Sequence, residues 1–208
     1  MKKKIIMMAA LCAVGTAATA QLEKGRLMIG GNVGYFRSNQ ESQFYNHKLK
    51  SLSISPTAGY FIKDNLAIGT SLRYYSNKIN ASNYIQKQSS YALIPFIRYY
   101  LNISSEFSFF AEFALAAGIG NSEEFALHEP YYRKESKYKE YGAALAPGLA
   151  FLPAKRWSVN LRFNLLDYSN TQVKDLSDDA ENKHYVGSNQ FNFGFNTIRP
   201  SIGVNYHL

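Results

Sequence analysis

The residues of this chain that could bind a metal are few and scattered. No pair of histidines stands at the H-x-x-x-H or H-E-x-x-H spacing of a zinc site. Cys12 is the only cysteine, so a thiolate site is not expected either. We therefore predict no metal and interpret three of the four histidines as solvated loop residues, with the last at a rim; the four are His47, His128, His184 and His207.

Two other patterns bear on chemistry. The acidic run at residues 175–181 (DLSDDAE) lacks the glycine and the closing glutamate at calcium-loop spacing, so we expect a solvated loop, with calcium binding as the alternative. If the chain were an enzyme, Ser169 and His184 would be the best candidates for a nucleophile and its base. We predict no catalytic residues, no cofactor and no enzymatic activity.

A set of charged residues is more informative, because each lies at the small, polar parity of a segment that alternates between apolar and polar residues. If those segments enclose an interior, opposite charges at this parity can pair within it. We predict a structural charge network formed by Arg73, Arg98, Glu112, Arg162 and Arg199.

Composition limits the elements that can position these residues. The chain has 208 residues, of which 15% are aromatic and 18% charged, so it is expected to fold. Three lysines at residues 2–4, an apolar run at 5–14 and the Ala18-Thr19-Ala20 cleavage pattern predict a removed secretory signal at residues 1–20 and one domain at 21–208. Without those lysines the net charge falls from +8 to +5, which does not favour nucleic acid.

Eight segments repeat one pattern, in which apolar residues alternate with small or polar ones over about ten residues. Alternation with period two predicts strands. The segments are 26–36, 51–62, 66–75, 90–101, 107–120, 140–152, 157–166 and 197–208.

The two faces of these strands differ in a way that bears on their surroundings. One face is large and apolar with no charge, and the other is dominated by Gly, Ala, Ser and Asn. A soluble barrel or sandwich would expose many Lys, Glu and Asp on its polar face. Small residues instead suit the crowded lumen of an eight-stranded barrel whose apolar face contacts lipid. We predict an all-β, eight-stranded antiparallel up-and-down transmembrane β-barrel.

The connections between the segments alternate in length. Short ones at 63–65, 102–106 and 153–156 separate long ones at 37–50, 76–89, 121–139 and 167–190. Short periplasmic turns and long outer loops are typical of outer-membrane barrels, which places both termini in the periplasm. Outward aromatic residues cluster near both ends of the segments, as expected for girdles at two membrane interfaces.

The short turns also predict contacts within the lumen. A turn at 102–106 puts residue 98 opposite residue 110, so Arg98 and Glu112 would be diagonal neighbours. Arg162 lies at a similar height above the turn at 153–156. We therefore expect Glu112 to lie ionised between Arg98 and Arg162 and to close the barrel.

The chain resembles the small eight-stranded outer-membrane barrels, such as the OmpA transmembrane domain and OmpX, and especially single-domain barrels of Bacteroidetes-type bacteria. The resemblance rests on the strand-turn-strand run PTAGYFIKDNLAIG at 56–69, the Ala20-Gln21 junction and the final strand SIGVNYHL at 201–208. Leu208 departs from the usual terminal aromatic residue, and Tyr206 is expected to replace it in recognition by the barrel-assembly machinery.

The resemblance implies an outer-membrane location in a Gram-negative bacterium and contact with outer-membrane lipids and lipopolysaccharide. Family members have structural, adhesive, pore-forming and enzymatic roles. Some deacylate lipid A through an H-Y-S-N run, but Asp167 replaces the histidine in Asp167-Tyr168-Ser169-Asn170. We expect a monomer with a structural or surface-interaction role, whose loop aromatics either bind an extracellular partner or pack together. A narrow channel or a lipid A-modifying enzyme is the alternative.

Overall fold

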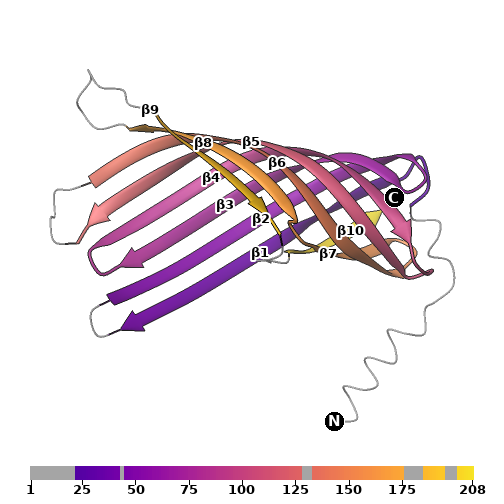
Figure 1. The fold of residues 1–208 in the computed structure, drawn as a ribbon. Coiled ribbons are helices and arrows are strands. Elements are labelled where there is room, and N and C mark those ends of the chain that lie inside the picture. The colour runs from indigo at the N-terminus through magenta and orange to yellow at the C-terminus, as the bar shows by residue number, and fades with distance from the viewer. Residues whose placement is uncertain (1–21, 43–44, 128–132, 176–184, 195–200) are drawn as a thin grey trace, which may run out of the picture.

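The computed structural model describes residues 22–42, 45–127, 133–175, 185–194 and 201–208. These residues form one antiparallel sheet (Figure 1). In this part of the chain no helix is long and apolar enough to cross a membrane. The strands are β1 (Leu27–Ser42), β2 (Tyr45–Lys63), β3 (Leu66–Ala81), β4 (Tyr84–Asn102), β5 (Phe107–Ala126), β6 (Arg133–Ala154), β7 (Trp157–Arg162), β8 (Leu166–Asp175), β9 (Tyr185–Phe193) and β10 (Ser201–His207).

Eight of the described strands close into a hydrogen-bonded ring. The order β5-β4-β3-β2-β1-β10-β7-β6 is completed by a ladder between β5 and β6. At the seam between the first and last strands, Met28 lies opposite His207 and Val33 opposite Ile202. The predicted fold class, an eight-stranded antiparallel barrel, is confirmed.

The seventh strand of the ring is divided by an extra residue. Leu149 of β6 pairs with Leu161, and Leu145 pairs with Leu166, so the six residues 161–166 lie opposite the five residues 145–149. Beyond this bulge, β8 takes the place of β7 beside β6, and β9 pairs with β8. The prediction of a loop over 167–190 is therefore wrong for the described residues, because polar residues above the apolar belt hide the alternation of a hairpin.

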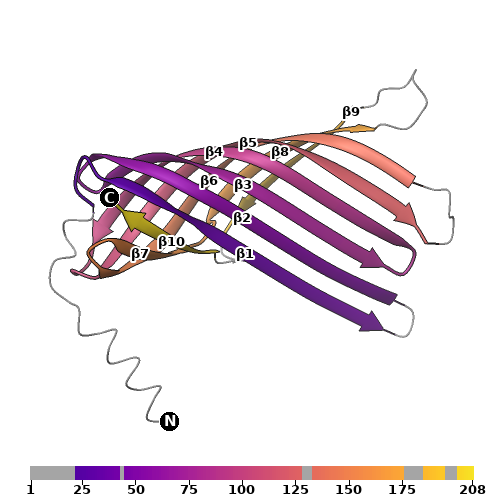
Figure 2. The same cartoon turned by 180° about the vertical axis from the view of Figure 1, so that it is seen from behind.

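The hairpins extend well beyond the length needed to cross a bilayer. β5 has 20 residues and β6 has 22, whereas a transmembrane strand needs about 9–11. Much of each predicted long loop is therefore strand. The β1–β2, β3–β4 and β5–β6 hairpins project together at the end opposite the short turns and stay paired with each other there (Figures 1 and 2). Among the described residues, β9 pairs only with β8, and β1 beyond Val33 pairs only with β2.

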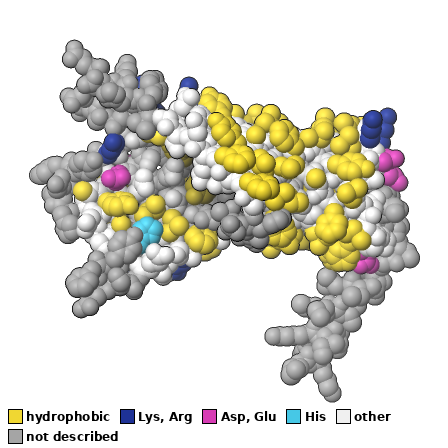
Figure 3. Space-filling view, in the orientation of Figure 1, with side chains coloured by type: hydrophobic (Ala, Val, Ile, Leu, Met, Phe, Trp, Pro, Cys, Tyr) yellow, Lys and Arg dark blue, Asp and Glu magenta, His cyan; other side chains and the backbone are white. Residues whose placement is uncertain are grey.

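The predicted outward parity is confirmed by the exposure of large apolar side chains. Val33, Leu93 and Leu115 are about half exposed on the outer wall, whereas their chain neighbours Ala92 and Ala114 are buried inside. Hydrophobic side chains form a broad belt over the half of the barrel near the short turns, with charged side chains beyond both of its edges (Figure 3). Paired outward aromatics mark the two edges, with Tyr74 and Tyr91 at one and Trp157 and Tyr206 at the other.

The β2–β3 turn helps to close the barrel at the end that carries the short turns. Asn65 adopts a φ of 63° in the β2–β3 turn, a left-handed conformation that asparagine tolerates well. Its backbone donates a hydrogen bond to the carbonyl of Leu22 (2.7 Å), and its own carbonyl accepts one from Tyr100 (2.8 Å). Leu22, which precedes β1, is thereby held under the barrel, where it is buried against the interior cluster.

Candidate functional site

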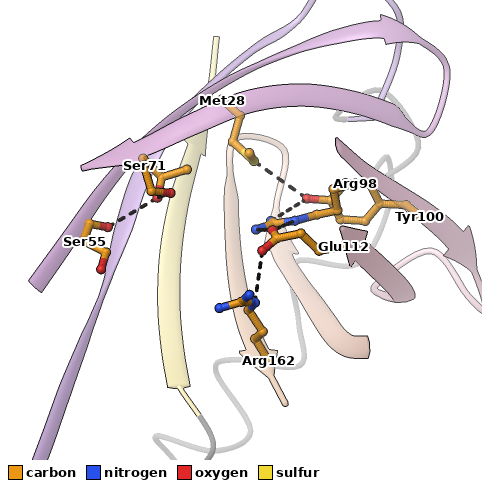
Figure 4. A network of polar contacts seen from close by, with 8 residues as sticks. Met28, Ser55, Ser71, Arg98, Tyr100, Glu112 and Arg162 are labelled. Atoms are coloured by element: carbon orange, nitrogen blue, oxygen red, sulfur yellow. Dashed lines mark hydrogen bonds and ion pairs between the residues drawn. The ribbon is translucent and has the colours of Figure 1, made fainter. Parts of the chain in front are cut away.

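The lumen of the turn-end half contains a buried cluster of ionised side chains. Arg98 on β4 and Glu112 on β5 lie directly opposite each other in the ladder, and Arg162 projects from β7 (Figure 4). Arg98 donates from Nε (2.8 Å) and Nη2 (2.5 Å) to Oε2 of Glu112. The other carboxylate oxygen lies 3.0 Å from Nε of Arg162. One carboxylate therefore joins three strands of the ring across its interior.

The predicted diagonal relation between Arg98 and Glu112 is wrong by two residues. Asn102 pairs with Ser108, so the turn is centred on Ser105 and not one residue earlier. Ser104 moves the turn, because its hydroxyl accepts the backbone N–H groups of Glu106 and Phe107. Arg98 and Glu112 are consequently direct partners, closer than a diagonal pair.

Aromatic side chains enclose the ionic cluster. The guanidinium carbon of Arg98 lies 4.7 Å from the ring centroid of Phe110 and 5.2 Å from that of Phe96. Nη1 of Arg98 donates to the Tyr100 hydroxyl (3.1 Å), which in turn points at the sulfur of Met28 (3.7 Å). Such stacking against a desolvated cation is stabilising. Uncharged aromatic side chains therefore surround Arg98, and only 7% of Arg98 and 5% of Glu112 is exposed.

Below the cluster, towards the short turns, the lumen is packed with side chains. Phe61, Tyr100 and Phe110 are in ring contact, and Leu152 and Leu22 complete this layer. These large inward residues were missed by an interpretation that assigned small residues to the lumen. The sequence carried a signal for Phe61, Tyr100, Phe110 and Leu152, because each lies at the inward parity of its strand.

His207 belongs to the same interior and not to the rim that the sequence suggested. It is 2% exposed, and its Nε2 lies 3.0 Å from the Ser158 hydroxyl. Its ring also packs 6.0 Å from that of Phe61. The strand's alternation explains this position, because Tyr206 and Leu208 face outward and the residue between them must face inward. His207 therefore packs inside the barrel between Ser158 and Phe61.

A second ion pair crosses the lumen higher up. Arg73 on β3 lies 2.5 Å from Glu140 on β6, two strands that are not neighbours in the ring. Glu140 was not predicted as a network member, although its parity matches that of Gly142 and Ala144. Arg199 and His184 lie outside the described residues, as do most of residues 175–181. The structure therefore places Arg73 in a different pair from the Glu112 cluster.

Two spaces lie in the lumen among the described residues, and the larger one is at the hairpin end. A polar cavity of about 340 Å³ lies there among inward side chains that include Gln88, Glu124 and Tyr138. Beside Arg98, Arg162 and Asn160 the remaining cavity is about 20 Å³, which holds about one water molecule. Tyr138, Arg73 and Glu140 lie between these two spaces in the register of the strands. The lumen thus has a polar cavity at the hairpin end and is filled by side chains at the turn end. We call the filled part, from the Glu112 cluster to the aromatic layer of Phe61, Tyr100 and Phe110, the plug.

Other candidate chemistry is sparse. Ser169 faces inward on β8 opposite Gly142, and Asp167 accepts a hydrogen bond from Asn192 (3.0 Å). Within the described part of the chain, no group of three or more His, Cys, Asp and Glu residues could hold a metal ion. Both oxygens of Glu112 lie against arginine, Oε2 against Arg98 and Oε1 against Arg162, so this carboxylate links three strands of the barrel.

A closed antiparallel ring with an apolar outer wall and a filled polar interior defines an outer-membrane β-barrel protein. The chain matches the outer membrane protein beta-barrel domain family over residues 6–198 and belongs to that family. Its fold is similar to that of the outer membrane protein OprG from Pseudomonas aeruginosa, with a TM-score of 0.50, 12% identity and coverage of 91% of this chain and 98% of that one.

A second solved structure is the translocator domain of the autotransporter NalP from Neisseria meningitidis. It matches with a TM-score of 0.45 and 11% identity, and the match covers 99% of this chain and 93% of that one. No curated protein matches the chain. The comparisons thus define the family and the fold, and the role depends on the site.

Proposed function

We propose that this protein is a non-conducting outer-membrane barrel with a structural or surface-interaction role. The observation that supports this role is the ion pairing of Glu112 with both Arg98 and Arg162 across the lumen. A buried carboxylate shared by two guanidinium groups is costly to separate, because each charge would lose its partner inside a low-dielectric interior. With the aromatic layer beneath it, the cluster blocks solute passage.

The binding surface in this proposal is the set of hairpins that project past the apolar belt. We place these hairpins outside the cell and both ends of the barrel in the periplasm, because short turns at the periplasmic side are usual for such barrels. The β3–β4 and β5–β6 hairpins carry Tyr84 and Phe125 near their ends. Aromatic side chains there provide contact area for an extracellular partner. The protein is proposed to act as a monomer.

Conductance is the direct test of the closed lumen. Purified wild-type protein inserted into planar bilayers is expected to give no steady single-channel current. The Glu112→Ala variant is expected to give brief, fluctuating currents, because the change leaves two unpaired cations in the lumen. Asn121→Ala, an outward change on the same strand, is the matched control and should behave as wild type. A steady open level in the wild type would favour a narrow channel instead.

A gene deletion separates the surface role from a lipid-modifying one. Deletion is expected to change surface adhesion and to leave the mass profile of lipid A unaltered. Complementation with the wild-type chain should restore adhesion. A lipid A species that disappears on deletion and returns on complementation would contradict the proposal and favour an enzyme.

A further inference from the structure

A depression on the outer wall combines cations with an apolar floor. It lies over β4, β5, β6 and β8 and has a volume of about 590 Å³. Lys137, Lys139 and Lys174 surround it, and Tyr91 and Ile119 form its apolar side. We refer to these five residues as the lysine pocket. All five lie at the outward parity, so the pocket faces the surroundings of the barrel and not its lumen.

The strand register brings like charges together in the lysine pocket. Lys137 lies directly opposite Lys174 in the β6–β8 ladder, and Lys139 is two residues further along β6. Like charges directly opposite each other in a sheet are destabilising. None of the three lysines is in an ion pair with an acidic residue of the described chain. Glu140, which directly follows Lys139 in sequence, faces the lumen and binds Arg73. An external anion would relieve this repulsion.

The height of the pocket on the barrel indicates the kind of anion. Tyr91 and Ile119 are exposed members of the apolar belt, and Lys139 lies directly opposite Ile119 in the β5–β6 ladder. The lysines therefore begin where the apolar belt ends. A ligand that fits both parts has an anionic group at the membrane surface and hydrocarbon chains below it. Lysine binds phosphate as a compact charge with several donors, and basic residues at this height attract anionic lipid headgroups.

We propose that the lysine pocket binds the phosphate of a phosphorylated lipid, with Lys137, Lys139 and Lys174 around the phosphate and an acyl chain along Tyr91 and Ile119. With the hairpins outside the cell, as proposed above, the lipid is lipid A of the outer leaflet. The assignment of the lipid rests on that orientation. The existence of the anion site depends only on the strand register and on the three lysine charges, and not on the orientation.

The test uses the full chain, folded in a non-ionic detergent, and titrates it with bisphosphorylated lipid A. Binding is followed by native mass spectrometry, and folding is checked by heat-modifiable migration on a gel. The variant is Lys137→Gln/Lys139→Gln/Lys174→Gln. The matched control, Lys24→Gln/Lys63→Gln/Lys155→Gln, removes the same charge from exposed lysines at the turn end. Lipid A without phosphates and inorganic phosphate are the comparison ligands.

The pocket variant is expected to bind lipid A roughly tenfold more weakly or worse, because three attractive charges are removed. The control variant should bind as the wild type does. Dephosphorylated lipid A should bind weakly to all three proteins, and inorganic phosphate should not compete at lipid A concentrations. Equal affinity of the pocket variant and the control would overturn the site, and competition by inorganic phosphate would overturn the lipid assignment. Reversed hairpins would defeat the proposed function without changing this titration.

Discussion

Arg98 and Glu112 face each other across the β4–β5 ladder, and two nitrogens of the arginine bind a single oxygen of the carboxylate. The second oxygen remains for Arg162, on a strand that is not adjacent to β5 in the ring. This division of one carboxylate makes Glu112 the shared partner of two cations. The consequence is an asymmetry between the members of the cluster, which mutation can measure.

Glu112→Ala is expected to destabilise the barrel more than Arg98→Ala. The first change leaves two buried cations unpaired, whereas the second leaves Glu112 with Arg162. Removing one member of a buried pair typically costs about 3–5 kcal/mol, and Glu112→Ala should lie at the upper end. Urea unfolding in lipid vesicles, followed by tryptophan fluorescence, would give both midpoints. Glu112→Gln tests the charge at constant shape, and a midpoint for Glu112→Ala equal to wild type would contradict the closed-lumen proposal.

Leu115→Arg is expected to impair assembly, because Leu115 is 49% exposed within the apolar belt of β5. Arginine near the bilayer midplane costs about 2–4 kcal/mol in such barrels. Asn121→Arg, six residues along the same strand and beyond the belt, should be tolerated. The yield of folded protein in the outer membrane is the measurement. Equal yields would mean that lipid does not contact this part of β5.

Period-two alternation predicted the eight strands of the ring because burial and lipid contact act on alternate residues throughout the membrane-spanning part. The same signal fades above the belt, where both faces of the strands contact water, so the sequence pattern does not reveal β8 and β9. In the lumen, parity located Arg98, Glu112 and Arg162. The direct pairing of Arg98 with Glu112 could not be predicted, since it depends on how Ser104 hydrogen-bonds within the turn.

Cysteine labelling tests the orientation, because Cys12 is the only natural cysteine. Ser82→Cys lies in the β3–β4 connection and Lys155→Cys in the β6–β7 turn, and both positions are exposed. In intact cells a membrane-impermeant maleimide is expected to label Ser82→Cys and to spare Lys155→Cys. Both should react after the outer membrane is opened, and the wild type should stay unlabelled. The opposite pattern in intact cells would place the hairpins in the periplasm.

Gly148 provides a test of the packed plug, since it leaves space for an aromatic ring. A Cβ at this position would lie 2.1 Å from the ring of Phe110 and 2.6 Å from the backbone carbonyl oxygen of Leu161. The second contact is with backbone, so the side chain of Phe110 cannot relieve the clash by moving alone. Gly148→Ala is therefore expected to lower the free energy of unfolding by about 1–3 kcal/mol, the usual range for overpacking.

Gly34→Ala is the matched control for Gly148→Ala, because its Cβ would meet only the Ser53 Cβ at 3.8 Å, an ordinary contact. Both glycines face inward on strands, so the two substitutions change strand propensity alike and differ in packing. The double variant Gly148→Ala/Phe110→Ala should recover only part of the loss, since the contact with the Leu161 carbonyl remains. If Gly148→Ala unfolds at the same urea concentration as Gly34→Ala, the ring of Phe110 does not lie against β6 and the plug is less tightly packed than described.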